Sequence, residues 1–221
     1  MLCGIVRIFK GKNKFVFLGE EFSDQALILS NHVGTDGPLS FEIGLKQTFR
    51  FWGTYYMNGS LKELYKYQSY NFYHLKKGWN IHAARALCLV AAPLTYLFYR
   101  GLNLISTYAD ARLRGTFEES LATLSEHQSI IIFPENSENG YLAELEGFHK
   151  GFIGLAEHAL KKGMDLPIYV TYLEKSQHRH IVAAPIKFSE LKARYSSRDE
   201  IAAAMCERCN ELGRMAREHK I

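Results

Sequence analysis

Short runs of apolar residues alternate with longer segments in which apolar residues recur at helical spacing along this chain of 221 residues. The short runs predict strands, and the longer segments predict helices between them. Such alternation is typical of strand–helix units, so we predict an α/β fold with a largely parallel central sheet flanked by helices. The predicted strands cover residues 5–9, 15–18, 26–30, 104–107, 129–133, 167–171 and 181–184.

The starts of the predicted helices carry local signals. Pro38 suits the first position of a helix, because the N–H that proline lacks would have no partner there. Thr116 and Ser197 each precede a glutamate by three positions, as in a capping box. Residues 150–162 predict a helix with one apolar face. No internal repeat or linker interrupts the chain, so we predict one domain over residues 1–221.

Two predicted strands end on side chains that can move or accept protons. Strand 26–30 continues into Asn31 and His32, and strand 129–133 continues into Pro134 and Glu135. Ligands of open α/β sheets bind beyond the carboxyl ends of the strands. We therefore expect the two segments to share a cleft.

His32 is the candidate general base, because an imidazole accepts protons near neutral pH. Asp36 follows four positions later and could orient the ring and stabilise its charged form. The alternative is that Asn31, Asp36 and Gly37 are only turn and cap residues, with no chemistry at His32.

The second segment supports the chemical interpretation. Glu135 could accept hydrogen bonds from a polyol, and Lys150, near a helix start, could bind an anion. Each residue alone could equally be a solvated surface group. Their order along the chain, after the histidine segment, favours a common site.

The order of these motifs resembles the lysophosphatidic acid acyltransferase (PlsC-like glycerolipid acyltransferase) family. The matching blocks are residues 27–32, 93–101 with 104–107, 133–135 with 148–151, and 166–170. The resemblance implies a glycerolipid-acyltransferase-like domain. It also implies transfer of a fatty acyl group from an acyl-CoA or acyl-carrier-protein thioester to the hydroxyl of a lipid acceptor. That acceptor would be a lysophospholipid such as 1-acylglycerol-3-phosphate, or another polar lipid.

The resemblance also implies roles for single residues. His32 would be the general base and Asp36 its orienting partner. No metal and no bound cofactor are implied, since the acyl thioester is a co-substrate. The residues that would bind substrate are Asn31, Glu135, Asn136, Ser137, Lys150, Arg112 and Arg114.

The chain departs from the family pattern in its spacing and its arginines. Three residues separate His32 from Asp36, where the family has four. Asn136 and Glu138 stand where the family has glycine and a phosphate-binding arginine, and the second block lacks its final arginine. These changes remove bidentate phosphate contacts, so acyl transfer is better supported than a glycerol-phosphate acceptor. The cations that could compensate are Arg112, Arg114 and Lys150.

Two alternatives to this family stay open. The pattern His-x-x-x-Asp-Gly also resembles chloramphenicol acetyltransferase and condensation-domain acyltransferases, which would imply CoA-dependent transfer to a non-lipid acceptor. In those proteins the aspartate is mainly structural. The altered blocks also permit a noncatalytic lipid-binding relative. A serine hydrolase is disfavoured, because no G-x-S-x-G elbow occurs.

Charge and aromatic residues suggest a membrane partner. The net charge of +4 suits anionic lipid, and no module or basic run indicates nucleic acid. Residues 61–79 mix aromatic rings with lysines, which predicts peripheral attachment through residues 61–99, unless the rings pack on the sheet. The apolar stretch 86–99, interrupted by Pro93, predicts no membrane span. We expect a cytoplasmic protein, peripheral on the inner face of a membrane.

The four cysteines suggest no disulfide framework. Cys206 and Cys209 have C-x-x-C spacing in a helical segment, but no second pair completes a metal site. They are predicted to be half-buried thiols on a helix rather than a redox or metal centre.

Overall fold

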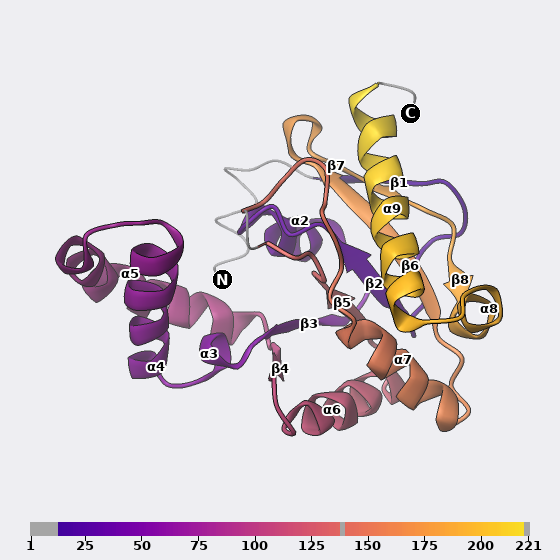
Figure 1. Cartoon of the computed structure of the whole chain (residues 1–221), viewed down its shortest axis with the longest axis horizontal. Coiled ribbons are helices and arrows are strands. Elements are labelled where there is room, and N and C mark those ends of the chain that lie inside the picture. Colours follow the sequence, from indigo (N-terminus) through magenta and orange to yellow (C-terminus); the bar gives the residue numbers. More distant parts are fainter. Residues whose placement is uncertain (1–12, 138–139, 219–221) are drawn as a thin grey trace. The chain divides into compact units, whose positions relative to one another are not determined.

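The computed structural model describes residues 13–137 and 140–218 (Figure 1). The chain divides into two compact units, unit 1 (Met1–Phe49 with Ser120–Ile221) and unit 2 (Arg50–Glu119). The fold is α/β, with mostly parallel strands flanked by helices, as predicted. The predicted strand at residues 5–9 lies outside the described residues. A single domain over residues 1–221 stays a prediction.

The strands of unit 1 lie in the order β1-β7-β6-β2-β5, with β8 paired to β6 off this path. The pairs β1–β7, β2–β6 and β2–β5 are parallel, whereas β7 and β8 run antiparallel to β6. The bounds are β1 (Lys14–Phe17), β2 (Leu27–Ser30), β5 (Ser129–Ile132), β6 (Pro167–Glu174), β7 (Arg179–Val182) and β8 (Ile186–Lys187).

The central strands are buried on both faces. Every residue of β2 and β5 is buried. Strands buried on both faces consist of continuous apolar runs, and for that reason these two could be predicted from the sequence. Helix α9 packs along β6 and beside α7 (Figure 1). The helices of unit 1 are α2 (Asp36–Gly44), α7 (Gly151–Lys161), the 3-10 helix η2 (Lys175–Gln177), α8 (Phe188–Arg194) and α9 (Arg198–Arg217).

Unit 2 combines a two-stranded parallel ladder with helices that pack on one another. β3 pairs with β4, and α5 packs against α4 and η1. η1 is a π-helix, a form that is rare in proteins. The elements are β3 (Phe49–Thr54), α3 (Tyr55–Asn58), α4 (Leu61–Lys66), η1 (Tyr67–Lys76), α5 (Ile81–Gly101), β4 (Ile105–Thr107) and α6 (Leu113–Ser125), which continues into unit 1.

Pro93 does not end the apolar helix α5, which runs through it for 21 residues. Within the described part of the chain, α5 is the one helix that is long and apolar enough to cross a membrane by length and composition. The prediction that no segment reaches this length was therefore wrong. Proline removes one backbone hydrogen bond, but packing against α4 and η1 supplies stability that helix propensity does not.

The predicted helix starts are partly right. α2 begins two residues before Pro38, and α6 begins three residues before Thr116. The hydroxyl of Thr116 donates instead to the Ser106 carbonyl, at 2.6 Å. Ser197 does cap α9, accepting a hydrogen bond from the backbone N–H of Glu200. The predicted helix at 150–162 is confirmed as α7, one residue shorter at each end.

Candidate functional site

His32 and Glu135 follow neighbouring parallel strands of unit 1. β2 and β5 pair with Leu29 opposite Ile132, so the chain leaves both strands at the same carboxyl edge. The Oε2 atom of Glu135 accepts a hydrogen bond from the backbone N–H of His32, at 2.9 Å. The two segments therefore lie side by side, whereas the cleft that we expect them to share stays a prediction.

Glu135 is buried, with 7% of its surface exposed. Its backbone forms an antiparallel bridge with Phe148, and the N–H of Asn136 donates to the Gly147 carbonyl at 2.9 Å. A buried carboxylate requires hydrogen-bond donors, and the His32 N–H is one of them. The alternative of a solvated loop carboxylate at Glu135 is therefore wrong.

Two aromatic rings contact the imidazole of His32. Its centroid lies 4.9 Å from that of Phe133 and 5.0 Å from that of Tyr141, with the Tyr141 ring nearly parallel at 16°. The Nδ1 atom of His32 is buried. Phe133 ends a strand that the sequence predicts. Tyr141 stands in a polar loop, and no sequence signal links it to His32.

The turn that follows His32 has an unusual backbone. Val33 and Gly34 have φ angles of 45° and 63°. A left-handed conformation costs a β-branched residue about 1–3 kcal/mol, so it persists only where neighbours fix it. A Cβ atom on Gly37 would lie 2.2 Å from the carbonyl oxygen of His32. The first turn of α2 therefore packs directly on the His32 backbone and requires glycine.

Asp36 begins α2, where the partial positive charge of the helix N-terminus favours a carboxylate. Its Oδ2 atom forms an ion pair with Nζ of Lys175, at 2.7 Å. Lys175 begins η2, directly after β6. Asp36, the predicted partner of His32, thus also ties α2 to the segment after β6, through a lysine that the sequence did not suggest.

Asn31, predicted to bind substrate, holds two strands together. Its Nδ2 donates to the Leu173 carbonyl at 3.2 Å, and its Oδ1 accepts from the Leu173 N–H at 2.7 Å. The pairing of β2 with β6 ends at Ser30 opposite Thr171. The amide of Asn31 continues this pairing beyond the strand and thereby fixes the backbone next to His32.

The other predicted binding residues of unit 1 lie in or after the loop that carries Glu135. Asn136 and Ser137 directly follow Glu135, and the N–H of Asn136 donates to the Gly147 carbonyl, as described above. Lys150 is the N-cap residue of α7, and its Nζ forms an ion pair with Asp199 of α9, at 2.8 Å. The structure thus joins Asn136 to Gly147 next to the Glu135–Phe148 bridge and pairs Lys150 with the start of α9.

Arg112 and Arg114 belong to unit 2. Arg112 bonds both carboxylate oxygens of Asp110 and lies over the ring of Tyr108, at 4.4 Å from its centroid. These bonds lower the pKa of Asp110 to about 2. Arg114 pairs with Glu118 one helical turn later, at 3.0 Å. Both predicted phosphate ligands therefore have a carboxylate partner within their own unit.

Cys206 and Cys209 lie on α9, as predicted, but both are buried rather than half-buried. Burial raises the pKa of the Cys206 thiol to about 11 and that of Cys209 well above its ordinary value. Protonated thiols are poor nucleophiles and poor metal ligands. In residues 13–137 and 140–218, no group of His, Cys, Asp and Glu could hold a metal ion.

A second histidine, His180 of β7, is completely buried and carried no sequence signal. Its Nε2 lies 2.6 Å from the Ser40 hydroxyl and its Nδ1 lies 3.2 Å from that of Thr171. Its ring stacks on Phe15, with centroids 4.6 Å apart. Burial lowers the pKa of His180 to about 3, so it is a weak base. The Ser40–His180 pair is structural and joins α2 to β7.

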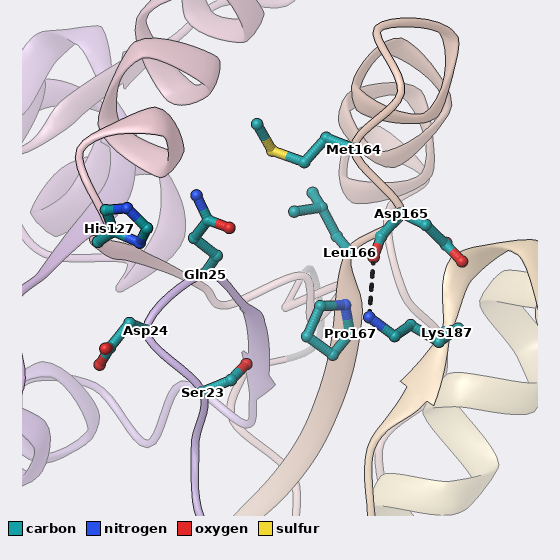
Figure 2. Close-up of a pocket in the computed structure, with 9 residues that line it drawn as sticks. All are labelled: Ser23, Asp24, Gln25, His127, Met164, Asp165, Leu166, Pro167 and Lys187. Atoms are coloured by element: carbon teal, nitrogen blue, oxygen red, sulfur yellow. Dashed lines mark hydrogen bonds between the residues drawn. The ribbon is translucent and has the colours of Figure 1, made fainter.

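A pocket of about 270 Å³ lies at the opposite, amino edge of the same sheet (Figure 2). Its lining includes Gln25 before β2, His127 before β5 and Pro167 at the start of β6. Lys187 donates to the Asp165 carbonyl at 3.2 Å. None of the predicted site residues lines this pocket, so it is not the cleft that the sequence predicts.

Unit 1 therefore presents one candidate centre at the carboxyl edge of its sheet. A histidine ring contacts two aromatic rings, and its backbone is bonded to a buried carboxylate. Such an arrangement is suited to proton transfer. No protein-family model matches the sequence, and no curated protein matches it closely enough to indicate a relative.

Proposed function

We propose that this protein is an acyltransferase that moves a fatty acyl group from an acyl-CoA or acyl-carrier-protein thioester to a hydroxyl of a lipid acceptor. The observation that carries the proposal is the position of His32. Its backbone is bonded to the buried Glu135, and its ring contacts Phe133 and Tyr141. The order of the sequence motifs supports the same reaction.

In the proposed reaction, His32 is the general base. Burial of Nδ1 leaves Nε2 as the atom that would take the proton of the acceptor hydroxyl. The hydroxyl oxygen attacks the thioester carbonyl carbon and forms a C–O bond. The C–S bond then breaks, and the thiolate leaves with the proton that the imidazolium returns. The products are an ester and a thiol, so the reaction balances without an additional reactant.

Asp36 is the candidate that would stabilise the imidazolium from the first turn of α2. Glu135, Asn136 and Ser137 would bind the polar part of the acceptor. A lysophospholipid acceptor such as 1-acylglycerol-3-phosphate also needs a cation for its phosphate. Lys175, 65% exposed beside Asp36, is a further candidate for that role.

We place the protein in the cytoplasm, peripheral on the inner face of a membrane. Two observations support this location. The net charge is +4, and α5 is exposed, since only 17% of its most apolar 18-residue segment is buried. A location at the lipid surface would bring the proposed centre to acceptors that are insoluble in water.

A second candidate is a CoA-dependent acyltransferase of the His-x-x-x-Asp-Gly type with a non-lipid acceptor. The ion pair between Asp36 and Lys175 favours it, because the aspartate of that type is mainly structural. Both candidates give His32 the same role, so the nature of the acceptor distinguishes them.

The test is transfer of a labelled acyl group, from both donor types, to lipid and non-lipid hydroxyl acceptors. His32→Ala should lower kcat/KM about a thousandfold. His127→Asn is the matched control, because His127 lies at the other edge of the sheet and asparagine tolerates its φ of 59°. Equal turnover of wild type and His32→Ala would reject His32 as the base. Lipid binding without transfer would indicate a noncatalytic lipid-binding protein.

A further inference from the structure

The large apolar side chains of α5 face solvent, the reverse of an ordinary amphipathic helix. Its buried stripe consists of the small residues Ala84, Cys88 and Ala92. Small side chains allow α4 and η1 to pack closely on this side. Soluble proteins rarely expose a contiguous apolar face, so the outward face indicates a partner. Its residues are Leu87, Leu89, Val90, Leu94 and Leu97, which are 40% to 69% exposed.

The length of this face argues for insertion parallel to a membrane rather than across it. All 21 residues of α5 together reach the length of a membrane span, but its uncharged part is shorter. The 14 residues between Arg85 and Arg100 carry no charge and extend about 21 Å, less than the ~30 Å of a hydrocarbon core. α4 packs along α5 and carries Lys62, Glu63 and Lys66. A spanning α5 would carry these charges into hydrocarbon, at a high cost in free energy.

The charge of the same segment identifies the kind of membrane. Residues 61–101 contain six lysines and arginines and one glutamate, a net charge of +5, whereas the whole chain has +4. Basic residues beside an exposed apolar face are typical of segments that bind anionic lipids. Tyr70 and Trp79, 51% and 46% exposed, add rings of the kind that favour the headgroup region.

A groove of about 680 Å³ in unit 2 adjoins this face. Lys66 of α4 and Arg85 of α5 both line it, and Arg85 precedes the exposed Leu89 by one helical turn. Glu63 lines the groove too, and its carboxylate accepts hydrogen bonds from Ser60. Two cations together with hydroxyl groups can still bind a phosphate. The tyrosines that line the groove are Tyr56, Tyr65, Tyr67 and Tyr70.

We propose that α5 lies in the plane of an anionic phospholipid membrane. Its outward leucines and valine enter the acyl-chain region, and the groove at Lys66 and Arg85 binds the phosphate of an anionic phospholipid. A second copy of the chain is the poorer occupant, because two segments of net charge +5 repel each other whereas anionic headgroups attract them. The surface belongs to unit 2, and the proposal holds or fails independently of acyl transfer at His32.

Co-sedimentation of the full chain with vesicles tests this surface. The chain should bind phosphatidylcholine vesicles that contain phosphatidylglycerol and bind pure phosphatidylcholine at least ~10-fold more weakly. Binding should fall between about 0.1 M and 1 M salt, because the Debye length shortens from ~10 Å to ~3 Å. Equal binding to both vesicles, or none to either, would overturn the proposal.

Matched variants separate the apolar contact from the charge contact. Leu89→Asp and Leu94→Asp should each weaken vesicle binding ~10-fold or more. Leu18→Asp, at a leucine of unit 1 that is 43% exposed, should not weaken it. Arg85→Glu should reduce the preference for anionic vesicles, whereas Arg194→Glu, with the same change in net charge at an exposed residue of α8, should leave it unchanged. Equal effects of a variant and its control would reject a specific surface.

The remaining outcomes concern depth and self-association. In a Trp52→Phe background, the fluorescence of Trp79 should shift to the blue with anionic vesicles and be quenched by lipids brominated near the headgroup. Quenching only by lipids brominated at the bilayer centre would contradict a helix in the interface. A dimer that becomes monomeric on Leu89→Asp, without vesicle binding, would assign the face to a second copy.

Discussion

Helices α7 of unit 1 and α5 of unit 2 are both apolar, yet they bury opposite kinds of side chain. α7 buries the large residues Phe152 and Ile153, and it packs beside α8 and α9. α5 buries Ala84 and Ala92 and exposes Leu94. Apolar content therefore does not decide which face of a helix is buried, because the neighbouring elements decide it. In unit 1 the large apolar residues of α7 belong to the core, and in unit 2 those of α5 form an exposed surface.

The largest expected effect separates the roles of the two units. His32→Ala should lower acyl transfer about a thousandfold, or ~4 kcal/mol in transition-state free energy, and leave vesicle binding unchanged. Leu94→Asp should weaken vesicle binding and leave acyl transfer unchanged when the acceptor is dispersed in detergent. Activity and vesicle binding of both variants are measured on the same preparations. Loss of both properties in either variant would end the division of roles.

The second prediction compares the two helices as parts of the core. Ile153→Ala should lower the free energy of unfolding by about 2–5 kcal/mol, because the side chain is fully buried and leaves a cavity. Leu94→Ala, at a side chain that is 64% exposed, should change it by less than about 0.5 kcal/mol. Urea unfolding of the two variants measures both values. A large loss at Leu94 would mean that the outward face of α5 is covered within the folded chain.

The sequence predicts those parts of the site that depend on neighbouring strands. His32 and Glu135 could be placed together because both follow continuous apolar runs, which mark strands buried on both faces. β3 was missed, since Arg50 and Gly53 interrupt its apolar pattern, and β8 has only two residues. The contact of Tyr141 with His32 depends on how a polar loop folds back, which no local pattern encodes.

Side-chain partners were the least predictable feature. Asp36 was paired with His32 by spacing and by the family resemblance, and the structure adds an ion pair with Lys175, which is far away in the sequence. The burial of His180 likewise follows from the packing of β7 against Phe15 and α2. Such contacts join segments through tertiary structure, so helical or strand periodicity could not reveal them.

The third prediction concerns the pH dependence of stability that the buried His180 gives to unit 1. The pKa of His180 is about 3 in the folded protein and near 6.5 when unfolded, so only the unfolded chain gains a proton as the pH falls below 6.5. The folded state should lose about 1.4 kcal/mol per pH unit below that value, and ~2 kcal/mol between pH 7 and pH 5.

Urea unfolding at pH 5, 6 and 7 measures this loss. His180→Gln should remove it, because glutamine does not titrate, whereas the control His127→Asn should keep the wild-type slope. The contribution is fully present above the unfolded pKa and is lost as the pH falls toward the folded value. Equal slopes for wild type and His180→Gln would show that His180 is not held neutral by the core.

The smallest expected effects test whether the two units unfold separately. Ser60 caps α4 in a reciprocal box with Glu63, and Ser197 caps α9. Each serine-to-alanine change should cost about 1 kcal/mol, the usual value of an N-cap. Native-state hydrogen exchange should show Ser60→Ala lowering protection in unit 2 alone and Ser197→Ala in unit 1 alone. If either change lowered protection throughout the chain, residues 1–221 would unfold as one domain, and the contrast between α5 and α7 would lie within a single cooperative structure.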